Sequence, residues 1–593
     1  MTATVPSSAR PGSISVLLWL VGAMAAKRTG LRRAVVAGAA IEAIVIGLGI
    51  AGPYLLKALV DVLPGPAPSR GMATFLVVAF AAAWAGAAIL STWRLRFSTR
   101  IIDRLTSILV SGALQRQLPA TACGREGDSG RMLGLLERLP FALTVVVDGL
   151  IWRVVPLAIQ LIGSLAVLIH VVPVRFAVVL ALVLTGYVAA AWAGAVSHQR
   201  LSSDANAAAS RVSGELGDIL RNARRVVFNG ALPLEVARVD HGFAERASAN
   251  RQLIASLTVM SALQYGLIGF GLAILLGMAV GDAVAGRMTV ANFVLLQAYV
   301  FALVAPLSGF GFILSQAATG IATVEEVVSL VGGEEKGGGV GEPAPASCPA
   351  DIRLQHVSFR YGTNPAGLDD VDLVIPAGSF TAIVGSNGSG KSTLAQITAG
   401  VLQPTSGSVI VGGQDMADVP PDLRHHFVLY VPQLVTLFNR SLGDNALYPP
   451  AEHTEDDLVT LLNAWRFHET ERAVDLTALA GEGGERLSGG QLQKLELARI
   501  AGMTAPAIIL DESTSALDPT SEARIVRELR EQFDGRTTLV LVTHRLTVAE
   551  VADQVVFLKG GRLMRQGRHD KLMADSAAYA NFWKGGGRAS TGT

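Results

Sequence analysis

Six long apolar segments fill most of the first 320 residues and constrain the fold more than any other feature of the chain. They cover residues 34–58, 72–93, 143–170, 173–197, 255–281 and 290–314. Each is near or above the roughly 20 residues that a helix needs to cross a bilayer. Half of the 593 residues are apolar and only 16% are charged, which is typical of a membrane protein. We therefore predict an all-α domain of six membrane-spanning helices in the first half of the chain.

The connections between these segments indicate their orientation. The connections near 64–68, 172–173 and 281–287 are short, whereas 94–140 and 198–251 are long and rich in arginine. Basic loops stay on the cytoplasmic side of a membrane. We therefore expect a multi-pass protein of the bacterial inner (plasma) membrane with cytoplasmic N- and C-termini.

Both long connections show helical periodicity, so the spanning helices are expected to continue into the cytoplasm. Two short helices, at 127–138 and 217–227, would form the tips; amphipathic surface helices without a partner are the alternative. The apolar stretch at 14–28 is too short to span a bilayer. We interpret it as an interfacial helix, with a cleavable signal as the alternative.

Polar residues inside the apolar segments are candidates for a cargo pathway, because burying them in a membrane is costly. Hydrogen bonds between helices are an equally good explanation for each one. The candidates are Glu42, Asp148, Arg153, Gln160, Gln264, Tyr265, Asn292, Gln297 and Tyr299.

Residues 332–350 are rich in glycine and proline and lack periodicity, which indicates a linker. We therefore expect a membrane domain at 1–331 and a second domain at 351–593. The 49 basic residues are balanced by 48 acidic ones, which gives no support to nucleic-acid binding. Cys123 and Cys348 lie far apart, so neither a disulfide framework nor a zinc site is indicated.

The second domain contains a candidate phosphate-binding loop. A strand-like stretch runs into a segment that fits the pattern G-x-x-x-x-G-K-[ST] and then into a helix. The candidate nucleotide-binding residues are Gly385, Ser386, Asn387, Gly388, Ser389, Gly390, Lys391, Ser392 and Thr393. The glycines let backbone N–H groups converge on phosphate, Lys391 supplies charge, and the Ser392 hydroxyl suits Mg²⁺.

Other expected strands end on groups that suit ATP hydrolysis. Tyr361 closes one strand, where its ring could stack on adenine or simply pack. Gln433 ends another, where ligand sites of α/β proteins usually lie. The strand at 507–511 delivers Asp511 to hold Mg²⁺ and Glu512 to polarise a water for attack on the γ-phosphate. His544 ends the last strand and could contact the same phosphate.

A second helix start also suits a phosphate. Ser488, Gly489, Gly490 and Gln491 open a helix, so free N–H groups and the positive helix end would face an anion. One ATP site does not need two such helix ends. The arrangement makes sense if two copies of the chain pair and each closes on the other's nucleotide.

Residues 15–585 resemble an ATP-binding cassette (ABC) exporter half-transporter. The phosphate loop matches the Walker A motif, Tyr361 the A-loop, Gln433 the Q-loop, and 508–512 Walker B. Residues 487–491 match the family's signature motif, 515–518 its D-loop with Asp518, and His544 its H-loop. The signature helix carries Leu492 where the family often has lysine or arginine, and Lys494 where it often has arginine.

The resemblance implies two ATP and Mg²⁺ held between two half-transporters in a membrane. The resemblance implies that Glu512, His544 and Gln433 are the catalytic residues. It also implies that Ser392, Gln433 and Asp511 bind Mg²⁺. Since Glu512, His544 and Ser488 are all present, neither site of a homodimer would be degenerate, so a homodimer is favoured, with a heterodimer as the alternative.

The cargo is less constrained. Residues 286–296, Pro306 and Gln264 are similar to exporters of glutathione-type thiols and to bacterial peptide exporters, but Gln297 and Ser308 replace asparagines common in the thiol exporters. We expect ATP-driven export of a peptide, a thiol conjugate or another amphipathic small molecule. Alternatives are a lipid flippase or multidrug exporter, an importer of a siderophore-like ligand, and a nucleotide-gated channel or regulator.

Overall fold

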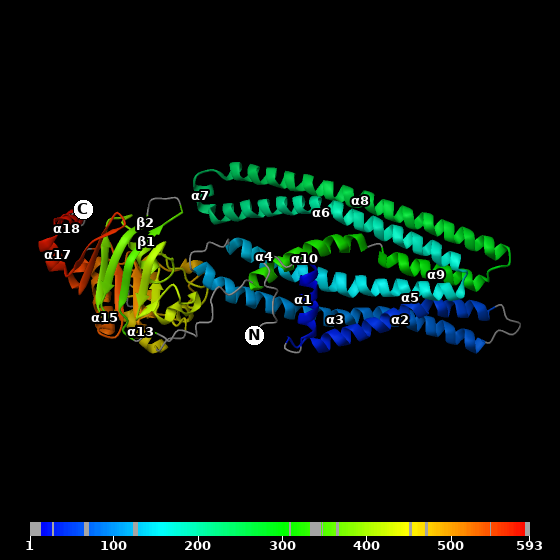
Figure 1. Ribbon diagram of the computed structural model, residues 1–593, viewed down its shortest axis with the longest axis horizontal. Helices are drawn as coiled ribbons and strands as arrows, with labels where there is room; N and C mark the ends of the chain where they lie inside the picture. Colours follow the sequence, from blue (N-terminus) through cyan, green and yellow to red (C-terminus); the bar gives the residue numbers. More distant parts are fainter. Residues whose placement is uncertain are drawn as a thin grey trace. The chain divides into compact units, whose positions relative to one another are not determined.

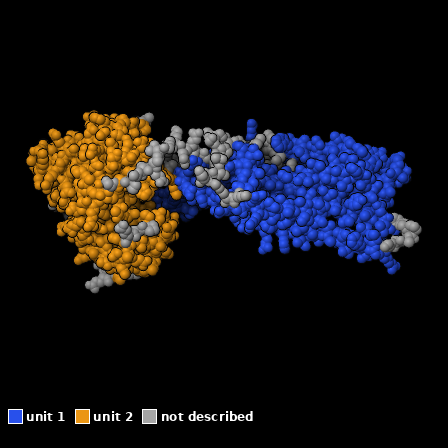
Figure 2. Space-filling view, turned by 60° about the horizontal axis from the view of Figure 1, so that its bottom comes forward, with its two compact units in different colours: residues 1–117, 128–334 blue, residues 118–127, 335–593 orange. Residues whose placement is uncertain are grey.

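The chain folds into two compact units (Figure 2). The computed structural model describes residues 13–26, 29–63, 70–122, 129–307, 310–332, 346, 348–362, 367–449, 453–468, 473–545 and 547–587. One unit comprises Met1–Gln117 and Asp128–Glu334, and the other comprises Leu118–Gly127 and Glu335–Thr593. The first is helical and the second is α/β, as the sequence predicts.

The first unit is built from long helices and one π-helical segment (Figure 1). The helices are α1 (Ser13–Ala25), α2 (Arg32–Val62), α3 (Arg70–Ala122), α4 (Ser129–Thr144), α5 (Val155–Val171), α6 (Val174–Arg221), α7 (Ala223–Phe228), α8 (Leu232–Val284), α9 (Val290–Leu307) and α10 (Phe310–Gly332). The π-helical segment, Val145–Val154, joins α4 to α5.

Five helical stretches of the described residues are long and apolar enough to cross a membrane. They are Arg32–Val62, Arg70–Pro119, Met132–Val171, Val174–Gly194 and Leu232–Val284. Val290–Ala302 is a shorter apolar helix at the start of the sixth expected span. Residues 308–309 of that expected span lie outside the described residues. The unit is thus a multi-pass helical membrane domain.

Three of these helices are much longer than a bilayer is thick. α3 and α8 have 53 residues each and α6 has 48, which corresponds to about 70–80 Å at 1.5 Å per residue. Since an apolar core is about 30 Å thick, each helix continues far beyond the membrane. α7 covers part of the second expected tip, and α4 covers residues 129–138 of the first, whose residues 127–128 lie outside the described residues.

The short helix α1 lies across the long helices (Figure 1). It has 13 residues, too few to span a bilayer. Val16 and Leu20 are fully buried in a cluster that also contains Leu105 of α3 and Val324 of α10. Apolar burial therefore fixes α1 against the helical bundle.

Several polar residues of the spans make contacts between helices. Arg94 of α3 lies between Glu42 of α2 and Asp148 of the π-helical segment, with N–O distances of 3.0 and 2.8 Å. The Tyr299 hydroxyl donates to the Ile50 carbonyl at 2.7 Å. The Tyr187 hydroxyl lies 3.5 Å from Gln264 Oε1. Interhelical bonding thus accounts for these candidates.

The second unit contains a six-stranded sheet, ordered β10-β9-β3-β8-β7-β6, and a four-stranded sheet, ordered β2-β1-β4-β5. Its strands are β1 (Ile352–Arg360), β2 (Gly367–Ile375), β3 (Phe380–Gly385), β4 (Ser406–Val411), β5 (Gln414–Asp415), β6 (Val428–Val431), β7 (Ala507–Asp511), β8 (Thr538–Val542), β9 (Gln554–Lys559) and β10 (Arg562–Gly567). Its helices are α11 (Lys391–Thr398), α12 (Leu442–Ala446), α13 (Glu455–Ala464), α14 (Gly489–Ala501), α15 (Pro519–Phe533), α16 (Thr547–Val551), α17 (His569–Asp575) and α18 (Ala577–Gly587).

The centre of the six-stranded sheet is parallel and fully buried. Every residue of β3, β7 and β8 is buried, as expected for apolar strands covered on both faces. In the registers of these pairs, Ile383 of β3 and Asp511 of β7 both lie opposite Val542 of β8. The carboxyl ends of these strands therefore meet at one edge, where α/β proteins bind ligands.

Candidate functional site

The phosphate-binding loop connects β3 to α11 at this edge. Gly388 and Gly390 have φ values of +76° and +98°, a region that glycine adopts without strain. A Cβ on Gly390 would also lie 2.8 Å from a Leu368 side-chain carbon. The Lys391 ammonium donates to the carbonyls of Gly385 and Ser386 at 3.0 and 3.2 Å. The loop thus wraps around its own lysine.

Asp511 ends β7 beside the start of α11. The Ser392 hydroxyl donates to one carboxylate oxygen at 3.0 Å, and the Tyr430 hydroxyl donates to the other at 3.0 Å. Asp511 is 1% exposed. Burial raises the pKa of its carboxyl, although both hydrogen bonds oppose that change. The hydroxyl of Ser392 and the carboxylate of Asp511 are hard oxygen ligands of the kind that Mg²⁺ prefers.

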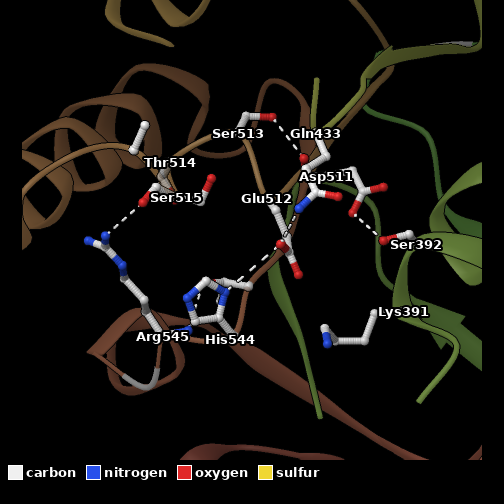
Figure 3. Close-up of polar contacts among 12 residues, drawn as sticks. Lys391, Ser392, Gln433, Asp511, Glu512, Ser513, Thr514, Ser515, His544 and Arg545 are labelled. Carbon is white, nitrogen blue, oxygen red and sulfur yellow. Dashed lines mark hydrogen bonds and ion pairs between the residues drawn. The ribbon is translucent and has the colours of Figure 1, made fainter. Parts of the chain in front are cut away.

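Glu512 follows directly and has a left-handed φ of +48°. Such backbone strain persists only where the surrounding structure fixes it. The Gln433 amide donates to Glu512 Oε2 at 2.8 Å, and His544 Nδ1 lies 4.0 Å from the same oxygen (Figure 3). The three residues assigned to catalysis from sequence are therefore brought together.

Tyr361 lies just beyond β1 and is 45% exposed. Its hydroxyl is 3.1 Å from the Thr393 hydroxyl at the start of α11. Phe359 contacts the ring edge-to-face, with centroids 4.8 Å apart. The Tyr361 ring is thus held beside the phosphate loop and keeps an accessible surface.

The signature helix α14 begins with a capping box. The Ser488 hydroxyl accepts from Gln491 N at 3.2 Å, and Gln491 Oε1 accepts from Ser488 N at 3.0 Å. Ser488 and Gly489 are exposed, and Gly490 is half-buried. Within the described part of this unit, no hydrogen bond or ion pair joins residues 488–491 to the phosphate loop. The two helix starts that the sequence analysis assigns to phosphate are therefore not bonded to each other.

Asp518 caps α15, whose first turn follows the strand-end carboxylates. Its side chain accepts from the backbone N–H groups of Thr520 and Ser521 at 3.1 and 2.9 Å. Hydrogen bonds from Ser521, foremost that from its side chain, lower the pKa of the Asp518 carboxyl. Asp518 thus stays ionised and holds the start of α15.

The sequence analysis missed two supports of this site. Arg545 donates to Glu522 Oε2 at 2.8 Å and to the carbonyls of Ser515 and Leu517 at 2.9 and 2.7 Å. Tyr430 holds Asp511, as described above. Arg545 directly follows His544, and Tyr430 lies on the strand before Gln433, so both could have been suspected from position alone.

Comparison with known proteins agrees with this geometry. Residues 368–515 match the family model described as ABC transporter. A solved structure of a bacterial Atm1-family ABC exporter with ATP bound superposes with a TM-score of 0.82, covering 95% of this chain and all of that one at 23% identity. The second unit therefore contains an ABC transporter domain, and the chain as a whole has the fold of an ABC exporter half-transporter. Its membrane domain is fused to an ATP-binding domain, and it hydrolyses ATP to drive transport across a membrane.

The curated relatives of this chain are named for different cargo. The mitochondrial iron-sulfur clusters transporter ATM1 of Gibberella zeae is 26% identical over 90% of this chain and 78% of its own length. The ATP-dependent lipid A-core flippase of Burkholderia pseudomallei is 34% identical over 59% of this chain. The mycobactin import protein IrtB of Mycolicibacterium smegmatis is 34% identical over 62%. The alignments with the flippase and IrtB span 58% and 62% of those proteins.

Proposed function

We propose that two copies of this chain form a dimer with two composite ATP sites that exports cargo from the cytoplasm. The signature helix start carries this proposal. Ser488 presents an exposed helix N-terminus that is not bonded to the chain's own phosphate loop. A second copy would supply the phosphate for it. Because Ser488, Glu512 and His544 all occur in one chain, a homodimer would have two complete sites.

In each site, one copy holds the nucleotide and the other closes over it. Residues 385–393 cradle the phosphates, Lys391 pairs with the β and γ groups, and Tyr361 stacks on the adenine. Residues 488–491 of the second copy face the γ-phosphate with their N–H groups. Asp518 holds the chain beside the site through its cap on α15.

Ser392 and Asp511 would hold Mg²⁺, with the Gln433 side-chain oxygen as a further ligand. The ion supplies charge neutralisation at the β and γ phosphates. The hydrogen bonds from the neutral Ser392 and Tyr430 hydroxyls oppose protonation of Asp511 and so favour the ionised carboxylate that the ion needs.

Glu512 accepts a proton from a water as the water oxygen bonds to the γ-phosphorus. The bond from that phosphorus to the bridging oxygen of ADP then breaks. Gln433 orients the Glu512 carboxylate through their 2.8 Å hydrogen bond. His544 faces the same carboxylate from the end of β8 and donates to the γ-phosphate.

The cargo is an amphipathic molecule such as a peptide, a thiol conjugate or a lipid, and the membrane is the bacterial inner membrane with both termini cytoplasmic. We assign the membrane domain to 1–331, the linker to 332–350 and the ATP-binding domain to 351–593. Residues 127–138 and 217–227 form the cytoplasmic tips and transmit closure to the spans. Import is a second candidate, because IrtB is named an importer and is 34% identical.

Mixed dimers of differently tagged copies test the composite site. K391A removes a loop lysine, and S488R blocks a signature helix. With each substitution on a different copy, both fall in one composite site and the other site stays intact. With both on the same copy, both sites are damaged. We therefore expect vanadate to trap one nucleotide per dimer in the first arrangement and none in the second. The reverse result would show that each chain completes its own site.

Transport into inside-out vesicles separates export from import. ATP outside such vesicles reaches the cytoplasmic face of the protein. An exporter accumulates glutathione conjugates, peptides or lipid analogues in the vesicle or its inner leaflet, whereas an importer empties preloaded vesicles. Cargo that leaves preloaded vesicles on ATP addition would overturn the export assignment.

A further inference from the structure

We propose that the first unit binds the phosphate headgroup of an anionic phospholipid in a basic pocket beside α1. The pocket measures about 830 Å³. Residues 29–31, in the turn between α1 and α2, form one wall. α3 forms the other and contributes Arg96, Arg100 and Arg104. The ATP-driven cycle described above uses none of these residues.

The three arginines present an unpaired basic face. They recur every fourth residue and therefore lie on one side of α3. All three are exposed, and none forms an ion pair with another described residue. Asp103 is the one carboxylate among the residues that line the pocket. Like charges at this spacing destabilise a helix, so an anion between them would relieve their repulsion.

Arg94 on the same helix shows the opposite arrangement. It is 7% exposed and pairs with Glu42 and Asp148. The chain thus supplies acidic partners for the buried arginine and leaves the exposed three without one. The difference points to a ligand from outside the chain.

The pocket lies at the depth of lipid headgroups. The apolar run at 72–93 ends on Trp93, which is 57% exposed, and tryptophan marks the membrane–water interface. A helix rises 1.5 Å per residue, so Arg96 and Arg100 lie about 5 and 10 Å beyond Trp93. Each headgroup layer is roughly 5–8 Å thick. Arg96 therefore lies within this layer, and the side chain of Arg100 points back toward it because helical side chains tilt toward the helix N-terminus.

α1 makes a lipid a better occupant than free phosphate. It lies across the spanning helices (Figure 1), which places it in the membrane plane. Its outward side chains Leu18 and Val21 are 67% and 51% exposed and can contact acyl chains. The Thr29 hydroxyl donates to the Ala23 and Ala26 carbonyls at 3.0 and 2.8 Å. This bonding fixes the turn that forms one wall of the pocket.

Lipid titration of the purified full chain in detergent micelles, followed by native mass spectrometry, tests the proposal. We expect the protein to bind phosphatidylglycerol more tightly than phosphatidylcholine. The R96Q/R100Q/R104Q variant should bind phosphatidylglycerol about tenfold to one hundredfold more weakly, with unchanged binding of phosphatidylcholine. The R96K/R100K/R104K variant should retain most of the affinity, because an ammonium still pairs with phosphate.

The matched control is R200Q/R246Q/R251Q, which removes three exposed arginines from α6 and α8. Retained phosphatidylglycerol affinity is expected there. An equal loss in both triple variants would overturn the proposal in favour of general charge attraction. Competition by millimolar inorganic phosphate would overturn the lipid as occupant. If the triple variant does not fold, R100Q alone is the test, and unchanged affinity in it contradicts a site at this pocket.

Discussion

Both units hold carboxylates that are buried or half-buried, but these carboxylates have different partners. In the ATP-binding unit, Asp511 accepts hydrogen bonds from two hydroxyls, and Glu512 accepts one from an amide. In the membrane unit, Glu42 and Asp148 flank the buried guanidinium of Arg94. Asp511 and Glu512 are hydrogen-bonded by neutral groups, so their negative charge can act on a ligand. The charges of Glu42 and Asp148 are compensated by Arg94 within the protein.

The difference indicates what each group is for. A buried carboxylate held by neutral donors is costly unless a cation or a reacting proton uses its charge. A carboxylate paired with arginine is compensated within the protein, and breaking that pair leaves a buried charge without a partner. We infer that Asp511 and Glu512 serve chemistry and that Glu42 and Asp148 serve to join helices.

Glu512→Gln gives the largest expected effect. Glutamine keeps the oxygen that accepts from Gln433 but cannot take a proton from water. Vanadate-sensitive ATP turnover should fall about 10²- to 10⁴-fold, while ATP binding and the thermal unfolding midpoint stay the same. The matched control is E531Q, which changes an exposed glutamate of α15 and should hydrolyse ATP normally. Undiminished turnover in Glu512→Gln would remove Glu512 from the mechanism.

Arg94→Met tests the other side of the comparison. Methionine fills the space but leaves Glu42 and Asp148 without their cation, which should lower the free energy of unfolding by about 3–5 kcal/mol. Denaturant unfolding in detergent micelles measures this change. Arg153→Met is the control, because Arg153 lies 3.6 Å from Asp148, farther than Arg94 at 2.8 Å, and its side chain is 58% exposed; its loss should cost less than that of Arg94. Equal losses would mean that Arg94 is not the cation that holds this cluster.

The sequence predicts the ATP site more completely than the membrane unit because its signals are local. The glycine spacing before Lys391, and the apolar strand before Asp511, each lie within a few residues of the group that they position. The structure then places Gln433, Glu512 and His544 together, as parallel strand ends require.

Contacts between distant segments leave no such local signal. Arg94 and Asp148 are 54 positions apart, and hydrophobic periodicity cannot pair them. Glu42 and Asp148 therefore stood as cavity candidates in the sequence, with helix contacts as an equal alternative. Arg545 and Glu522 are likewise 23 positions apart, and no sequence motif around either residue indicates that they are in contact.

A third kind of carboxylate is exposed to solvent, and its ion pair is expected to have the smallest effect on stability. Asp370 and Asp372 of β2 flank His356 of β1, with the Asp370 carboxylate 2.9 Å from His356 Nδ1. All three side chains are exposed, so solvent screens their attraction. The hydrogen bond to Asp370, followed by the charge of Asp372, raises the pKa of His356 above its ordinary value of 6.5.

A raised histidine pKa stabilises the folded protein fully below about pH 6.5, where the unfolded chain is also protonated. The stabilisation is lost as the pH rises through the folded-state value. The unfolding midpoint of the full chain should therefore exceed that of His356→Asn slightly at pH 6, and the gap should shrink by pH 9. His425→Asn removes an exposed histidine whose ring stacks on His426 and should show no such gap. A gap that grows with pH would reverse the assigned sign and show that His356 is held as the neutral ring.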